Sequence, residues 1–295
     1  MNHNETGSTL PRRQLGHYLR DARMALNMSL ERLAGAADLS SSVLQRLEKG
    51  QATRLKVRDI QAICVVLEMS DEMTTTLIGL LRQGAEKSWW HEYGSLIPAS
   101  VDVYVGLETA ARRLTTYQPS LVPGLLQTPD YARVLIRNAS PCESDAEHAR
   151  RVELRTKRQA IVTRKYQPAA LDVTLHESVL HTAVGGPRVL ATQLRHLAEI
   201  GKLPNVDIRV LPFSAAAPVG HPVGQFAILE FGEDSKGRPI EPPIVYLENF
   251  TGCMYLEKPE NVQRYYQVRD SLQRASLDET ASRSLLRQVA KELPA

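Results

Sequence analysis

Two short helical runs separated by only three residues constrain the fold of this chain more than any other feature of its sequence. Residues 29–37 and 41–49 each carry apolar side chains at helical spacing. A connection this short makes the two helices cross closely, and Ala34 supplies the small side chain that such a crossing needs. Asp38 suits the turn, because aspartate enters the left-handed backbone region more readily than most residues. Leu39 can then fill the gap between the helices.

The serines before the second run mark the beginning of a helix, although a serine triplet is usually found in a loop. Ser29 and Ser40 stand where N-cap residues are expected, one before each run. Lys49 and then Gly50 follow the second run, and a helix C-terminus favours a cation followed by glycine. Local signals therefore predict where both helices begin and where the second one ends.

Three more amphipathic runs complete the first part of the chain. They cover residues 12–27, 57–69 and 70–84, and Ser70 caps the last of them. No run in this part has the alternating pattern of a strand. The sequence thus predicts an all-α, five-helix domain over residues 1–84.

The basic residues of the chain are concentrated in this first part. Residues 1–58 hold ten Lys and Arg against five Asp and Glu, a net charge of +5, whereas the whole chain carries +3 and the remainder therefore −2. A basic head on a slightly acidic body favours a polyanionic partner for the head. A solvated surface with chance asymmetry is the alternative that charge alone leaves open.

Cysteine usage and hydropathy bear on the compartment. The three cysteines, Cys64, Cys142 and Cys253, are widely spaced and form no Cys-x-x-Cys pair, so neither a metal site nor a disulfide framework is expected. The N-terminal residues lack the apolar region of a secretory signal, and the longest apolar stretches are too short to cross a bilayer. We therefore expect a cytoplasmic protein with no membrane segment, metal or cofactor.

The first part of the chain resembles the λ-repressor-like helix-turn-helix family, also called the Cro/C1 or XRE type. The matching segments read LGHYLRDAR, MSLERLAGAADLS and SSVLQRLEKG, and together they cover about residues 13–70. The resemblance implies a DNA-binding domain whose third helix enters the major groove. It also implies that Arg23 on the first helix pairs with Glu48 and ties the third helix to the scaffold.

The family geometry assigns a DNA-contacting face to the third helix. Glutamine can bond bidentately to adenine, serine can bond to base edges or phosphates, and nearby basic residues can contact the DNA backbone. The residues predicted to contact DNA are Ser41, Ser42, Gln45, Arg46, Lys49, Arg54, Lys56, Arg13 and Arg32. Because one small module is usually too weak to be specific, we expect a homodimer on double-stranded DNA.

The second part of the chain, residues 85–295, has a different composition. It begins with the aromatic segment SWWHEYGSLIPAS, which we interpret as the junction between two domains. Its patterns predict helices over 103–117, 129–139, 143–166, 188–202, 261–276 and 279–293, and strands over 171–178, 206–213, 224–231 and 244–250. Such a mixture indicates an α+β domain.

This second part resembles a domain of unknown function, DUF5753, attached to such heads in actinobacterial regulators called Scr1-like or WhiJ-like. The specific block is VPGLLQTPDYARVLI, followed by LHESVLHTAVGG and IVYLENFTGCMYLE, and the similarity runs over about residues 88–290. It implies a transcriptional regulator whose body senses an effector or binds a partner. Genes of this family often lie beside one for a small DUF397-type protein, which implies an antitoxin-like role.

The residues of the body do not predict an enzyme. His176 and His181 flank Glu177, but adjacent residues in a strand point to opposite faces, and no third ligand stands at metal spacing. Glu177 and Glu248 could form a polar pocket at strand ends, although capping or surface roles suit them better. The chain also has no serine elbow and no phosphate-binding loop.

Two functions of the body stay open at this point, binding of a small molecule and binding of a protein partner. A closed pocket with convergent polar groups would favour the small molecule, and an open apolar or edge-strand surface would favour the partner. For the whole chain, the alternative to a DNA-binding regulator is a protein-interaction adaptor whose head has lost its DNA affinity.

Overall fold

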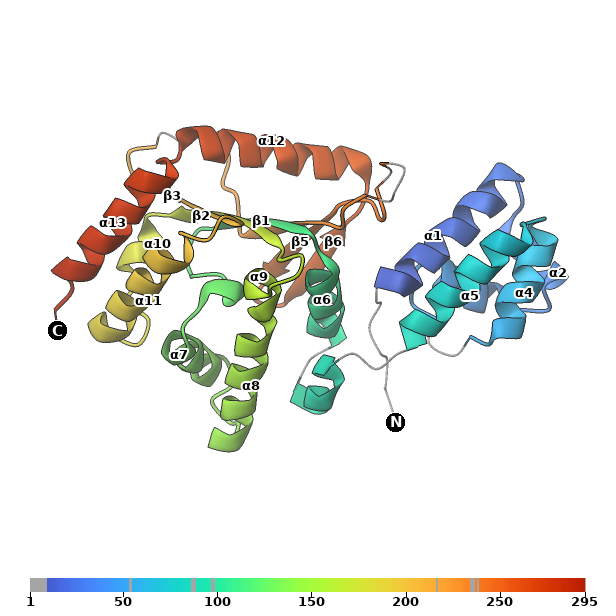
Figure 1. Ribbon diagram of the computed structural model, residues 1–295, viewed down its shortest axis with the longest axis horizontal. Coiled ribbons are helices and arrows are strands. Elements are labelled where there is room, and N and C mark those ends of the chain that lie inside the picture. Colours follow the sequence, from blue (N-terminus) through green and yellow to red (C-terminus); the bar gives the residue numbers. More distant parts are fainter. Residues whose placement is uncertain are drawn as a thin grey trace. The chain divides into compact units, whose positions relative to one another are not determined.

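Five helices form the head of the chain, and they confirm the all-α domain predicted from the sequence (Figure 1). They are α1 (Leu10–Ala25), α2 (Leu30–Ala36), α3 (Ser41–Glu48), α4 (Val57–Val66) and α5 (Asp71–Ala85). Their apolar faces meet in one core. Its fully buried members are Leu15, Leu19, Leu33, Ala34, Ala37, Leu44, Leu47, Ile60, Ile63, Cys64, Leu67 and Leu77.

The first four of these helices end in the same way. Each is followed by a residue in the left-handed region, namely Asn27, Asp38, Gly50 and Glu68, with φ between 50° and 67°. In each case the next residue donates its N–H to the carbonyl five positions back, over 2.8 to 3.1 Å. This arrangement satisfies carbonyls that a helix end leaves without partners. The left-handed turn predicted at Asp38 is therefore confirmed and is repeated through the domain.

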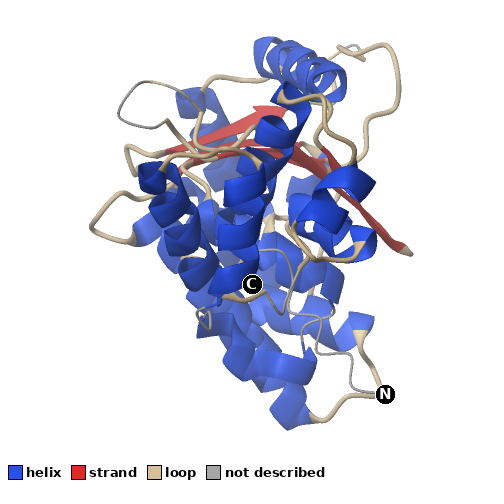
Figure 2. Cartoon of the chain, turned by 90° about the vertical axis from the view of Figure 1, so that its right-hand side faces the viewer, coloured by secondary structure: helices blue, strands red, loops and turns tan. Residues whose placement is uncertain are grey.

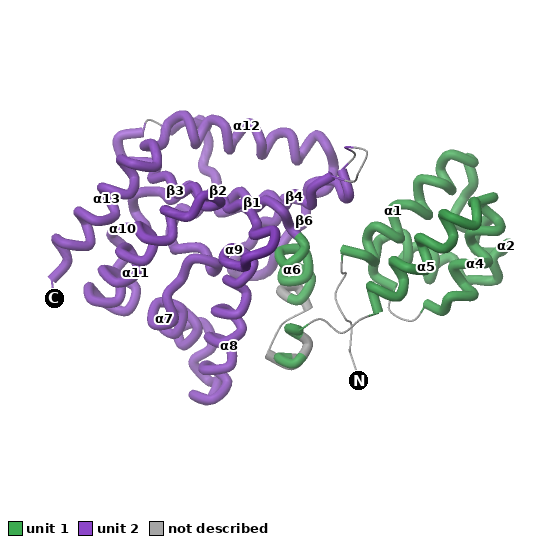
Figure 3. The backbone as a smooth tube through the Cα atoms, in the orientation of Figure 1, with its two compact units in different colours: residues 1–110 green, residues 111–295 purple. Residues whose placement is uncertain are grey.

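The structure, a computed structural model, divides into two compact units, residues 1–110 and 111–295 (Figure 3). It describes residues 10–52, 55–85, 89–96, 99–215, 217–233, 237 and 239–294. The first unit also holds the 3₁₀ helix η1 (Trp89–Leu96) and α6 (Ala99–Ala110). The sequence-based division after residue 84 precedes these two elements and stays a prediction.

The aromatic segment belongs to the first unit, where it contacts α6. Trp90 and Tyr93 are buried, and the indole N–H of Trp90 donates to Asp102 Oδ1 on α6 over 2.7 Å. The ring of Trp89 meets those of Trp90 and Tyr93 edge to face, with centroids 5.8 and 6.3 Å away. The aromatic residues thus fix η1 onto α6.

The second unit is built on one six-stranded sheet, drawn in red in Figure 2. The strands are β1 (Arg113–Gln118), β2 (Ala170–His176), β3 (Val206–Leu211), β4 (Phe226–Glu230), β5 (Ile244–Asn249) and β6 (Gly252–Leu256). They lie in the order β3-β2-β1-β4-β5-β6. β1, β2 and β3 are parallel, whereas β4, β5 and β6 are antiparallel to their neighbours.

Helices cover both faces of this sheet (Figure 1). The helices of this unit are η2 (Gly124–Leu126), α7 (Pro129–Ala139), α8 (Asp145–Arg158), α9 (Ala160–Thr163), α10 (Ser178–His181), α11 (Pro187–Ile200), α12 (Pro259–Ala275) and α13 (Glu279–Glu292). The long helix α12 covers one face. There its Val262 and Leu272 share a core with Tyr117, Phe226 and Val245 of the sheet. The α+β class predicted for the body is confirmed.

The elements predicted for the body differ from the structure most at β1 and β6. Residues 113–117, placed in a helix by the sequence, form most of the central strand β1. The helix ends at Ala110 and the chain then pairs with β2 and β4, so that tertiary pairing overrides the helical spacing. The strand β6 was also missed, because Gly252 and the short hairpin loop mask its pattern. Among the described residues no helix is long and apolar enough to cross a membrane.

Candidate nucleic-acid interface

The connection between α2 and α3 is closed by local hydrogen bonds. Ser29 caps α2 by accepting the N–H of Arg32 over 3.2 Å, and Ser40 caps α3 by accepting the N–H of Val43 over 3.3 Å. Leu39 donates its own N–H to the carbonyl of Ala34 over 2.9 Å. The predicted capping serines therefore fix the direction in which α3 leaves the turn.

The inner side of α3 packs against α1 at very short range. Leu44 and Leu47 are buried, and α1 crosses the end of α3 at Gly16. A Cβ added to Gly16 would lie 2.4 Å from the carbonyl oxygen of Leu47 and 2.8 Å from that of Glu48. Only glycine permits this approach of the two backbones. The prediction from sequence missed Gly16, although a glycine inside a helical run often marks such a contact.

An ion pair holds the end of α3 to α1. Arg23 donates from Nε to Oε1 of Glu48 over 2.6 Å and from Nη2 to Oε2 over 2.8 Å, which makes the bidentate pair that the family resemblance implies. Nη1 of Arg23 donates to the carbonyl of Met28 over 2.7 Å. Both side chains are buried, and the hydrogen bond to Glu48 raises the pKa of Arg23. This pair fixes the position of α3 on the scaffold.

The outer side of α3 is polar and exposed to solvent. Its exposed members are Ser41, Ser42, Gln45, Arg46 and Lys49. Ser42 Oγ lies 3.2 Å from the hydroxyl of the capping Ser40, and Arg46 donates from Nε to the Ser42 carbonyl over 3.4 Å. Gln45 stands between Ser41 and Lys49 on this side, one helical turn from each. We name these five residues the α3 face.

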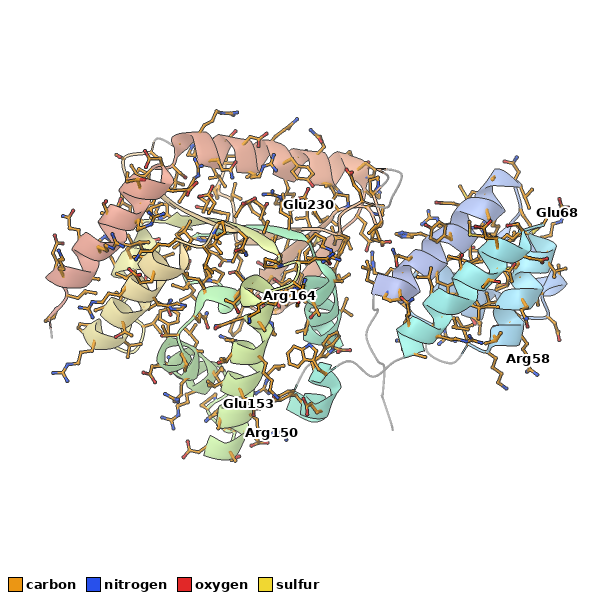
Figure 4. The ribbon with its side chains drawn as sticks, in the orientation of Figure 1. Arg58, Glu68, Arg150, Glu153, Arg164 and Glu230 are labelled. Atoms are coloured by element: carbon orange, nitrogen blue, oxygen red, sulfur yellow. The ribbon has the colours of Figure 1, made fainter. Side chains whose placement is uncertain are left out.

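Other basic residues flank the α3 face. Arg32 on α2 and Lys56 before α4 are exposed, and the backbone N–H of Lys56 donates to Asp59 Oδ2 over 2.8 Å. Arg58, whose side chain is 76% exposed, points away from the helices of the head (Figure 4). The predicted contact Arg54 lies outside the described residues.

Arg13 differs in exposure from the other predicted contacts that the structure describes. We expected it to reach the DNA flank, but it is buried, with 8% of its surface exposed. It lies against the turn after α3, where a Cβ added to Gly50 would be 2.9 Å from the Arg13 Cα. The beginning of α1 packs closely on this turn, and this contact accounts for the low exposure of Arg13. Arg13 thus packs against the turn after α3, and its contact with DNA stays a prediction.

The face has the chemistry of a DNA-reading surface. A glutamine amide matches the donor and acceptor pair of adenine in the major groove, and serine hydroxyls bond to base edges or phosphates. Lysine and arginine beside them match the phosphate backbone. Within the described ranges, no group of three His, Cys, Asp or Glu residues could hold a metal ion.

The block PGLLQT of the second unit forms a buried network of amides. Gln193 of α11, which has no exposed surface, donates to the Leu126 carbonyl and accepts the N–H of Thr128, each over 2.7 Å. Gln127 is also buried and donates to the carbonyl of Val122 over 2.7 Å. These side chains satisfy the backbone of a segment without regular structure, so the most specific block of the body has a structural role.

The polar residues at the ends of the parallel strands also have hydrogen-bond partners in the structure. Nδ1 of His176 lies 2.7 Å from Ser178 Oγ, which donates to the carbonyl of Pro119 over 2.6 Å. Glu177 Oε2 accepts the N–H of Phe213 over 2.7 Å. Glu248 is on β5, which β1 and β4 separate from β2 in the sheet, so Glu177 and Glu248 are not brought together by neighbouring strands.

Comparison with protein families finds one match toward each end of the chain. Residues 14–77 match a helix-turn-helix domain, and residues 101–288 match a domain of unknown function, DUF5753. No curated protein matches the chain. The first match identifies the head as a DNA-binding helix-turn-helix domain, and the second covers more than half of the sequence. The chain belongs to the DUF5753 family, with a helix-turn-helix domain at its N-terminal side.

Proposed function

We propose that this protein is a sequence-specific transcriptional regulator that binds double-stranded DNA as a homodimer, with α3 in the major groove. The observation that carries the proposal is the α3 face, which is polar, exposed and backed by the buried pair of Arg23 and Glu48. A helix of eight residues is too short to be stable alone, so its position depends on that support.

Each residue of the face has a separate role in this proposal. Gln45 reads a base edge bidentately, and Ser41 and Ser42 bond to a base edge or a phosphate. Lys49 and Lys56 bind phosphates and set the register on the duplex. Arg46 and Arg32 lie at the sides of the face and contact the adjacent backbone.

The body, in this proposal, binds an effector or a small partner protein and thereby changes how the two heads engage DNA. A ligand shifts such an equilibrium only by its difference in affinity for the two states. A small DUF397-type protein, and with it an antitoxin-like role, is the partner implied by the family resemblance.

We propose no catalytic role, since the side chains of His176, Glu177 and Ser178 form hydrogen bonds at the strand ends in the structure.

The contact assignment can be tested by binding to DNA from upstream of the gene of this protein. Gln45→Ala should weaken binding about tenfold, because a bidentate base contact contributes about 1–3 kcal/mol. The matched control is Gln83→Ala, an exposed glutamine on α5 that should leave affinity unchanged. Fluorescence anisotropy at a fixed salt concentration measures both.

Two results would contradict the proposal. Unchanged binding by a variant that combines Ser42→Ala with Gln45→Ala would show that another surface reads the DNA. No binding to any genomic fragment at low salt would favour the second candidate, an adaptor with a vestigial head.

Co-purification with the small protein of the neighbouring gene would distinguish a partner-binding body from a ligand sensor, which should purify alone.

A further inference from the structure

A hollow lies at the end of α3 in the head, and the α3 face does not account for it. Three parts of the head enclose it, namely the beginning of α1, the end of α3 with the turn that follows, and the end of α5. Its empty volume is about 350 Å³ out to the open mouth, at the lower end of the range for small-molecule sites. Its apolar lining includes Leu15, Leu47, Ala52, Leu55, Leu81 and Ala85.

The hollow extends from the core of the head to solvent. Leu15 and Leu47 are core residues with 1% and 2% of their surface exposed. Leu55 and Leu81 are half-buried, and Ala85 is exposed. Apolar side chains around an open hollow stay in contact with water, and an apolar group that fills the space removes that contact. The lining therefore favours a ligand with an apolar body.

Two glycines bring the beginning of α1 close to the other two parts of the head at this hollow. A Cβ added to Gly84 of α5 would lie 2.7 Å from Arg12 Cγ, and one added to Gly50 would lie 2.9 Å from Arg13 Cα. Gly50 also has a φ of 67°, which favours glycine at this position. A movement of α3 or α5 relative to α1 consequently changes the shape of the hollow.

The segments that line the hollow are strongly basic. Over residues 11–15, 47–52, 55–56 and 81–85 there is one acidic residue, Glu48, and its carboxylate pairs with Arg23. The same segments contain five basic residues, namely Arg12, Arg13, Lys49, Lys56 and Arg82. This surplus of positive charge favours an anionic ligand over a neutral or cationic one.

Arg12 is the charged residue in the lining itself. Burial lowers the pKa of its guanidinium, and the negative charge of Asp102 on α6 raises it. A guanidinium carries five N–H donors in a planar fork, so one arginine has donors for more than one carboxylate. A carboxylate beside Arg12 would form the charge-assisted hydrogen bonds that this fork favours.

We propose that this hollow binds a small organic anion, a carboxylate with a medium-length alkyl chain. The chain lies among the leucines of the lining, and the carboxylate lies beside Arg12. The charge surplus and the apolar lining together select this class, since neither a neutral hydrocarbon nor an inorganic anion satisfies both.

This site goes beyond the proposed function, which places effector binding in the body. Leu47 is in α3 and Gly50 is in the turn after it, so an occupied hollow acts on the end of the helix that carries the α3 face. A carboxylate at this place also offsets the charge of Lys49 and Lys56. The loss of DNA affinity that follows rests on the proposed function, whereas binding of the anion does not.

Isothermal titration calorimetry on the full-length protein without DNA tests the proposal, with octanoate and octan-1-ol as the probes. Octanoate should bind with a dissociation constant on the order of 1 mM, because a ligand of this size gains only a modest free energy per atom. Octan-1-ol has the same chain without the charge and should bind about tenfold more weakly. Arg12→Gln should remove this preference, and Arg20→Gln, an exposed arginine on the same helix, should preserve it.

A variant that fills the hollow supplies the second measurement. Ala85→Phe places a large side chain in the lining and should weaken octanoate binding at least fivefold, with unchanged circular dichroism. Ala25→Phe is the matched control, because Ala25 and Ala85 are both exposed alanines that end their helices, α1 and α5. Ala25→Phe should bind octanoate like the native protein.

Four results would overturn the proposal. They are no binding of octanoate, equal affinity for octanoate and octan-1-ol, a preference that Arg12→Gln leaves intact, and an affinity that Ala85→Phe leaves unchanged. Octanoate bound at another place on the protein would give the last two results. Since DNA is absent from every titration, a failure of the proposed DNA binding is distinguishable from a failure of this site.

Discussion

At the scale of single residues, the head depends on positions that carry no obvious functional chemistry. Gly16 and Gly35 are both helical glycines, yet their surroundings differ. A Cβ at Gly16 would meet backbone oxygen at 2.4 Å, whereas a Cβ at Gly35 would meet nothing within 4 Å. One glycine is required by packing and the other is not.

Gly16→Ala should therefore destabilise the head by about 1–3 kcal/mol, as an overpacked contact does, and should weaken DNA binding by displacing α3. Gly35→Ala, the matched control, should stabilise it by about 0.5–1 kcal/mol through helix propensity. Urea denaturation followed by circular dichroism measures both. Equal effects of the two substitutions would contradict the close crossing of α1 on α3.

The pair of Arg23 and Glu48 gives the second prediction at this scale. Glu48→Ala should cost about 3–5 kcal/mol, because it leaves a buried guanidinium without its counter-charge. The double variant Arg23→Met with Glu48→Leu should recover most of that loss. Thermal unfolding tests this, with the exposed Glu72→Ala as the control. A single variant no worse than the control would show that the pair does not hold α3.

At the scale of elements, helix ends are determined locally and strands are not. The left-handed residues Asn27, Asp38, Gly50 and Glu68 each lie two positions after the last residue of a helix, and serines cap α2 and α3. These signals act within one turn, so the sequence predicts them. The strand β1 carries the strand-favouring residues Thr115, Thr116 and Tyr117, but it follows a helical segment directly, and its pairing with β2 and β4 shows that it is a strand.

The PGLLQT segment provides the prediction at this scale. Gln193→Leu would leave the Leu126 carbonyl and the Thr128 N–H buried without their partner, and each such group costs about 1–3 kcal/mol. The body should lose about 2–6 kcal/mol of stability. Thr192→Ala, an exposed position on the same helix, is the control. Wild-type stability of Gln193→Leu in chemical denaturation would disprove the structural role of the block.

At the scale of the whole molecule, the distribution of charge sets how DNA binding responds to salt. The excess of basic residues lies in residues 1–58, and the face of α3 contributes few of them. Lys56→Ala should reduce the slope of log affinity against log salt by about 0.9, the contribution of one phosphate contact to B-DNA. Its effect should be the same for all DNA sequences.

Two comparisons make this test selective. Gln45→Ala should alter sequence preference and leave the salt slope unchanged, because a neutral amide releases no counterion. Arg82→Ala, an exposed cation on α5, should change neither quantity. A salt slope that Lys56→Ala does not change would exclude Lys56 from the phosphate contacts.

The sequence by itself determined the helices of the head, their caps, the Asp38 turn and the exposed side of α3. All of these follow from interactions within a few residues of one another. Only the tertiary structure decided that Arg13 is buried and that Gly16 is required. It also decided that Gln193 supports a segment some 65 residues away and that a serine of α13 caps β3. Those properties depend on which backbone lies against which, and residues distant in the chain determine that.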